Sequence, residues 1–182
     1  MKKNTIITLC LFAVVIAASF IMRVVPHPAN FIPIGALALL SGMYIKSKWG
    51  VLLAVAVMML SDLIIGMHSL VLFTWGSFLI FGMIGWWIRK NKNILRVVGG
   101  TLAGSTIFFI ITNFAVWAFT PLYNKTASGL VDSYYMAIPF FRSAALGDLF
   151  YVGIFVGVFE AVYYMAKVWN KSSQESSVII NN

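Results

Sequence analysis

The sequence predicts an all-α integral membrane protein: a bundle of six transmembrane helices with both termini in the cytoplasm. Three observations lead to this prediction: an apolar composition, six apolar runs and a one-sided distribution of basic residues. Of the 182 residues, 61% are hydrophobic and 10% are charged, and the mean hydropathy is +0.93. A soluble domain contains roughly 45–50% apolar residues, so this chain is expected to fold in lipid.

The apolar runs define the expected helices and the domain organisation. They cover residues about 5–22, 31–45, 49–66, 70–88, 94–119 and 143–169. Six helices of about 20 residues use about 120 residues, which leaves room for loops but not for a separate soluble domain. We therefore expect one domain, residues 1–170, followed by a disordered polar tail at residues 171–182.

The first two apolar runs each allow two interpretations. The first has the lysines of a secretory signal, and Ala17-Ala18-Ser19 resembles a cleavage region. Because five further apolar runs follow, an uncleaved first helix is the simpler interpretation. The second run, at 15 residues, is the shortest; it would form a helix of about 22 Å, against a hydrocarbon core of about 30 Å. It is expected either to tilt little or to lie embedded among its neighbours.

The positions of Lys and Arg predict the orientation, because cytoplasmic loops carry the excess of basic residues. With the N-terminus inside, ten of the 13 fall on the cytoplasmic side: Lys2, Lys3, Lys46, Lys48, Arg89, Lys90, Lys92, Arg96, Lys167 and Lys171. The other three, Arg23, Lys125 and Arg142, fall outside. Omitting the short second helix would spoil this asymmetry. The net charge of +8 therefore reflects membrane topology, and no nucleic-acid partner is expected.

Polar side chains within the apolar runs lie mainly towards the outer side. Asp62 lies about 20 Å along the third helix, and Asp148 lies near the outer start of the sixth. Ionisable side chains in a bilayer cost about 2.5–3.5 kcal/mol each on insertion scales, so their positions are informative. The sequence predicts an outward-facing pocket built from Arg23, His27, Asn30, Asp62, His68, Trp75, Asn113, Trp117, Tyr135, Arg142 and Asp148. Its arginines would suit an anionic group, its aspartates a cationic or hydroxyl-rich group, and its tryptophans a flat ring.

A purely structural interpretation of these residues stays open. Asp62 would then pair with Arg23 or Arg142, Asp148 would cap a helix, and the tryptophans would form an interfacial belt. No metal site or cofactor is expected, because the histidines lack metal-binding spacing and the single cysteine, Cys10, lies in the first helix. The sequence shows no nucleophile–base pair and no Walker A loop, so we expect neither an enzyme nor an ATPase.

Small residues four positions apart mark helix faces that allow close packing. Such pairs are Gly100 and Gly104, Gly153 and Gly157, and Ala13 and Ala17. Each pair is expected either to pack inside the bundle or to dock on a partner protein.

The chain resembles a bacterial membrane family of unknown function that is grouped with the S-components of energy-coupling factor (ECF) vitamin transporters. Four blocks carry the resemblance: RVVPHPANFIPIGALALLSG, SDLIIGMHSLVLFTWGSF, TNFAVWAF and AIPFFRSAALGDLFY. It implies a six-helix protein that binds a vitamin or metal ion near the outer surface and delivers it with a T-component and two ATPases. It also implies that Ala13 and Ala17, an AxxxA pair, dock on the T-component.

Cobalamin is one candidate solute within that group of transporters. Cys10 lies too deep in the first helix to be its cobalt ligand, which leaves His27, His68 or no protein ligand. Taken together, we expect a solute-uptake protein of the bacterial inner membrane, energised by a partner ATPase. Two alternatives stay open: a membrane enzyme acting on a lipid or quinone with Asp62, His68 or Asp148 as acid or base, and a structural or assembly subunit.

Overall fold

The protein is all-helical, as the composition and apolar runs predict. The computed structural model describes the backbone of residues 2–26 and 30–180, and the side chains of residues 5–26 and 30–171. Within these residues it contains α-helices and two short 3-10 helices but no β-strand. In chain order they are α1 (Lys2–Val24), α2 (Ile34–Tyr44), η1 (Lys48–Leu52), α3 (Leu53–Ile65), α4 (Val71–Ile88), η2 (Arg89–Asn91), α5 (Ile94–Phe119) and α6 (Ala127–Ile180).

Several helices are long and apolar enough to cross a membrane. In the described part of the chain there are five such segments: Thr5–Val24, Lys48–Ile65, Val71–Asn91, Ile94–Phe119 and Ala127–Lys171. The chain is therefore a membrane-embedded, multi-pass protein. The sixth predicted crossing, α2, has 11 residues and a length of about 16 Å, roughly half of a hydrocarbon core.

Helix α2 lies at the centre of the bundle, which accounts for its almost entirely apolar sequence. Every residue from Ile34 to Met43 is buried, and α1, α3, α4, α5 and α6 all contact it. The approach of α4 is so close that a Cβ on Gly42 would lie 2.0 Å from the Gly82 carbonyl oxygen. Of the two expectations for this segment, the structure therefore gives the embedded helix.

Hydrogen bonds hold the C-terminal end of α2. Arg89 Nη1 donates to the carbonyl oxygens of Ile45 and Lys46, both at 2.9 Å. The Tyr44 hydroxyl donates to Glu160 Oε1 at 2.6 Å, and Lys92 Nζ donates to the same oxygen at 2.6 Å. The last turn of α2 is thus linked to α6 and to the connection between α4 and α5.

Helix α6 is much longer than the predicted helix at 143–169. It begins at Ala127, passes through Pro139 and continues to Ile180, so residues 127–142, expected as an outer loop, are helical. Phe141 of this segment packs on α5, with its ring centroid 4.8 Å from that of Phe109, whereas Tyr135 and Phe140 are 66% and 51% exposed. Proline removes one helical hydrogen bond, and α6 continues through Pro139 while it packs against α5.

The tail at residues 171–182, expected to be disordered, is helical as far as Ile180, and residues 181–182 lie outside the described residues. Extending an existing helix avoids the cost of nucleation, so a polar tail can continue α6.

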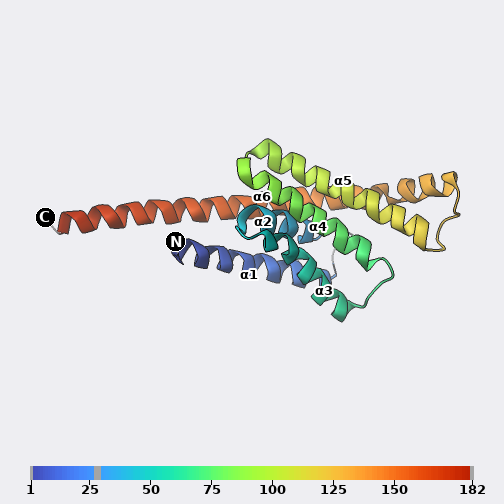
Figure 1. Cartoon of the computed structure of the whole chain (residues 1–182), viewed down its shortest axis with the longest axis horizontal. Helices are drawn as coiled ribbons and strands as arrows, with labels where there is room; N and C mark the ends of the chain where they lie inside the picture. Colours follow the sequence, from blue (N-terminus) through green and yellow to red (C-terminus); the bar gives the residue numbers. More distant parts are fainter. Residues whose placement is uncertain (1, 27–29, 181–182) are drawn as a thin grey trace.

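The helices run so that α1 begins and α6 ends towards the same end of the molecule (Figure 1). The connections between α3 and α4 and between α5 and α6 lie at the opposite end. We call this the loop end. The prediction that the loop end faces the outside stays a prediction.

Candidate functional site

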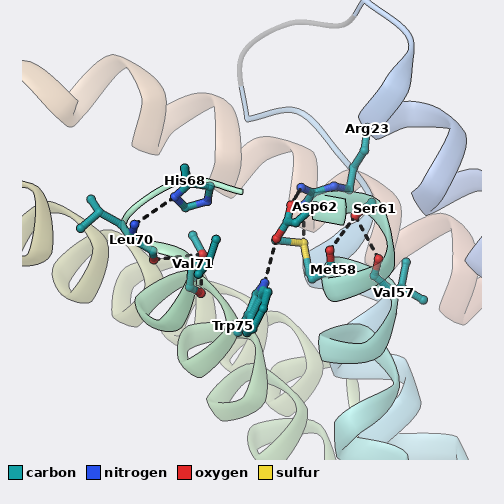
Figure 2. Close-up of polar contacts among 10 residues, drawn as sticks. Arg23, Val57, Met58, Ser61, Asp62, His68, Leu70, Val71 and Trp75 are labelled. Atoms are coloured by element: carbon teal, nitrogen blue, oxygen red, sulfur yellow. Dashed lines mark hydrogen bonds and ion pairs between the residues drawn. The ribbon is translucent and has the colours of Figure 1, made fainter. Parts of the chain in front are cut away.

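Three of the predicted pocket residues form a polar cluster that joins α1, α3 and α4. Arg23 forms an ion pair with Asp62 Oδ1 and also donates to the Met58 sulfur. Trp75 Nε1 donates to Asp62 Oδ2 at 2.8 Å, and the Asp62 residue is only 1% exposed. Figure 2 shows the carboxylate held between the guanidinium and the indole. Both Asp62 oxygens therefore have partners within the protein.

The end of α3 carries Asp62, and the chain turns there towards the start of α4. The Ser61 hydroxyl donates to the carbonyl oxygens of Val57 and Met58, both at 2.9 Å. Gly66 ends the helix with φ +115°, a left-handed conformation that favours glycine. Two residues later, His68 Nδ1 accepts from the Leu70 N–H at 3.2 Å. This bond holds the imidazole at the start of α4 (Figure 2).

The main cavity lies between α4, α5 and α6 near the loop end and has a volume of about 310 Å³. Aromatic rings, aliphatic side chains and neutral polar groups line it together. The lining residues are Asn30, His68, Leu70, Thr74, Ser105, Phe108, Phe109, Thr112, Asn113, Val116, Ala137, Phe140, Phe141 and Ala144. Three predicted site residues, Asn30, His68 and Asn113, are among them.

A smaller cavity of about 40 Å³ adjoins the main one. It is lined by Asn30, Ile32, Ile34, Phe78, Phe81, Phe108, Ala144 and Asp148. The two cavities have Asn30, Phe108 and Ala144 in common. A fourth predicted site residue, Asp148, thus contributes to the smaller cavity.

Asp148 is held by contacts from α5 and α2. Its residue is 8% exposed, and its Oδ2 accepts from the Ser105 hydroxyl at 2.7 Å. A Cβ on Gly35 would lie 2.1 Å from Asp148 Oδ1. The carboxylate therefore occupies space on the surface of α2 that only glycine leaves free.

Asn30 lies where the chain enters α2. It has φ +61°, a left-handed conformation that asparagine tolerates better than most residues. This turn places Asn30 in the lining of both cavities.

The other predicted site residues lie apart from the cavities or outside the described residues. Trp117 Nε1 donates to the Asn124 carbonyl oxygen at 3.0 Å, across the connection between α5 and α6. Tyr135 is 66% exposed, and Arg142 is exposed. His27 lies outside the described residues. Among the described residues, the linings of the two cavities do not include Arg23, Asp62, Trp75, Trp117, Tyr135 or Arg142.

Sequence reasoning missed the aromatic and hydroxyl-bearing walls, although a signal was present. The α5 residues that line the main cavity are Ser105, Phe108, Phe109, Thr112, Asn113 and Val116. Their spacing of three and four marks one helix face. A search for polar and aromatic residues on one face of each apolar run would have found this wall.

One small-residue pair packs inside the helix bundle, and the other two lie on its surface. A Cβ on Gly100 would meet Ile88, and a Cβ on Gly104 would meet Phe81, so this pair packs inside. By contrast, Ala13 and Ala17 are exposed on α1, and Gly153 and Gly157 have open space around them. Docking through Ala13 and Ala17 stays a prediction.

Acidic, histidine and cysteine side chains do not gather at the cavities. Among the described residues, no group of three or more that could hold a metal ion is present. The chemistry of the lining is therefore that of hydrogen bonding, aromatic contact and one carboxylate, which suits binding of a small organic molecule.

The fold and the site define a multi-pass, all-α membrane protein with a mixed aromatic and polar cavity near one end. The chain belongs to a family of unknown function, DUF6580, whose model matches residues 2–172. Neither a curated protein nor a solved structure matches the sequence.

Proposed function

We propose that the protein is the substrate-binding membrane subunit of an uptake system for a small solute, a vitamin or related micronutrient. The solute enters the main cavity from outside the cell, and a partner ATPase module supplies the energy. In this proposal α2 counts as a sixth, short membrane helix, both termini are cytoplasmic, and the protein resides in a bacterial inner membrane, as in ECF S-components.

The observation that carries the proposal is the cavity itself. A volume of about 310 Å³ lies at the lower end of the range for small-molecule sites, about 300–1,000 Å³. Its aromatic rings offer contact area, and the side chains of Asn30, Thr74 and Asn113 offer neutral hydrogen-bonding groups. This combination is typical of sites that bind and orient an organic solute.

The apolar side of the smaller cavity supports binding rather than passage of the solute. Phe78 and Phe81, which line it, belong to a buried apolar cluster that extends through α2 to Met43. A channel requires a polar or wettable path along its length. A cavity bordered by such packing instead favours a subunit that needs a partner to release its solute.

The partner is expected to supply both the energy and the docking surface. The sequence carries no Walker A loop, so ATP hydrolysis by that route falls to another protein. Ala13 and Ala17 lie exposed on one face of α1, where small residues allow close approach of another membrane helix.

Co-purification from native membranes tests this proposal. We expect the tagged protein to bring down a T-component-like membrane protein with ATPase subunits, and the double variant A13L/A17L to lose them. The matched control is A103L, which makes the same change at an exposed position of α5 and should retain the partners. A respiratory or secretion complex in place of an ATPase module would instead favour a structural subunit.

A further inference from the structure

Asp148 is a buried carboxylate without a cationic partner among the described residues. Its one hydrogen bond from a described side chain comes from Ser105 at 2.7 Å, and the ion pairs in this part of the chain are Arg23–Asp62 and Lys92–Glu160. A buried charge is costly unless it is paired. The two Asp62 oxygens contact the Arg23 guanidinium and the Trp75 indole. Asp148 instead accepts from the Ser105 hydroxyl and lines the smaller cavity.

The smaller cavity beside Asp148 has walls that suit a cation. Three phenylalanines, Phe78, Phe81 and Phe108, line it together with the carboxylate. The faces of aromatic rings attract ammonium groups, most strongly where water is excluded. Phe78 and Phe81 are 7% and 1% exposed, so water has little access to these two rings.

The rings are held in place by the surrounding helices. Phe81 packs on α5 so closely that a Cβ on Gly104 would lie 2.6 Å from the ring. The ring centroids of Phe78 and Phe108 lie 5.1 Å apart. The aromatic walls are therefore positioned before any ligand arrives.

The cavity volumes and charges agree with this interpretation. A volume of about 40 Å³ holds a group the size of a few waters, since one water needs about 10–15 Å³ by this measure. Among the residues that line the two cavities, Asp148 is the one aspartate or glutamate, and none is lysine or arginine. Arg23, which lines neither cavity, is paired with Asp62. The lining thus favours a positively charged group and offers no lysine or arginine to an anionic one.

We propose that the smaller cavity binds an ammonium group of the solute, between the Asp148 carboxylate and the three phenylalanine rings, while the rest of the solute occupies the main cavity. This inference rests on the proposed solute-binding function and specifies its ligand class: an organic cation with a flat or apolar body. Ser105 is a positioning residue, since it acts through the carboxylate.

Matched pairs of amines and alcohols test the proposal on the purified full-length protein. The amine probes are benzylamine, 2-phenylethylamine and 3-phenylpropylamine at neutral pH, and the neutral probes are the three corresponding alcohols. Thermal unfolding is followed in detergent over a concentration series of each probe. We expect at least one amine to raise the unfolding temperature in a saturable manner and its matched alcohol to have no comparable effect.

Variants assign the effect to the smaller cavity. D148N keeps the shape and an acceptor for Ser105, and we expect it to weaken amine binding by about 10- to 100-fold, as for loss of a charged hydrogen bond. The control D132N makes the same change at an exposed position of the same helix and should bind as wild type does. F81L, which removes one ring, should weaken amine binding by about 3- to 10-fold and supplies a second test should D148N fail to fold.

Equal stabilisation by amines and alcohols, unchanged amine binding in both D148N and F81L, or no binding of any amine would overturn the ammonium site. These results would not remove the broader proposal, because a neutral or anionic solute released from the purified protein would still show solute binding. Conversely, amine binding by a protein that brings down no ATPase module from native membranes would support the ammonium site and count against the uptake system.

Discussion

Replacing Asp62 by alanine will lower the stability of the protein by about 3–5 kcal/mol, the cost of breaking a buried ion pair from one side. Asp62 accepts from both Arg23 and Trp75, and it is almost fully buried. Its removal leaves the guanidinium unpaired and the indole N–H without an acceptor at the junction of three helices. Unfolding in detergent, by heat or by increasing SDS, measures the effect.

Two further variants separate the ion pair from the loss of volume. D132A, at an exposed position of α6, should change stability by no more than about 0.5 kcal/mol. The double variant R23M/D62L removes both charges and should recover most of the loss, because apolar replacement of a buried pair is often neutral. If D62A unfolded like the wild-type protein, the cluster would not contribute to the stability of the bundle.

Replacing Gly35 by alanine will reduce binding of the solute by about 10- to 100-fold, the range for loss of a charged hydrogen bond, while the bundle remains folded. The new Cβ would lie 2.1 Å from Asp148 Oδ1 and 2.8 Å from its Cγ. The carboxylate must therefore move, which disturbs both its bond from Ser105 and its position in the smaller cavity. Overpacking of this kind costs about 1–3 kcal/mol of stability, which the unfolding assay detects.

The matched control for this variant is G76A on α4, where an added Cβ has open space around it. It should bind the solute as the wild-type protein does, and it should be no less stable, because alanine favours a helix more than glycine does. Normal binding by G35A would mean that the observed position of the Asp148 carboxylate is not needed for the ligand.

The all-helical, multi-pass character of the fold follows from the apolar runs, because the bilayer requires long apolar helices. The limits of α6 did not follow, since hydropathy marks what lies in lipid and not where a helix begins or ends. Residues 127–142 and the polar residues after Trp169 extend that helix beyond its apolar middle. Burial of α2 on all sides was one of two expectations, and the packing of Gly42 on α4 selects it.

The candidate site was only partly predictable, because depth can be read from sequence but helix rotation cannot. Asn30, His68, Asn113 and Asp148 were grouped by depth, and they line the two cavities. The same grouping by depth included Arg23, Asp62 and Trp75. These residues bond to one another and line neither cavity. Of the open structural interpretation, the structure shows the pairing of Asp62 with Arg23. Asp148 does not cap a helix, because it lies within α6 and accepts a hydrogen bond from Ser105.

The most direct test of a solute-binding protein is to identify what the purified protein carries. The protein is purified in mild detergent, its absorbance spectrum is recorded, and the released small molecules are examined by mass spectrometry. The comparison is A144W, because Ala144 lines both cavities and a large ring there would obstruct them. A103W serves as the control at an exposed position of α5.

We predict that the wild-type protein and A103W release the same small molecule and that A144W releases little or none of it. A wild-type protein that is empty, and that no member of a vitamin panel stabilises against thermal unfolding, would contradict the proposed function. Equal release from A144W would place the solute outside the two cavities.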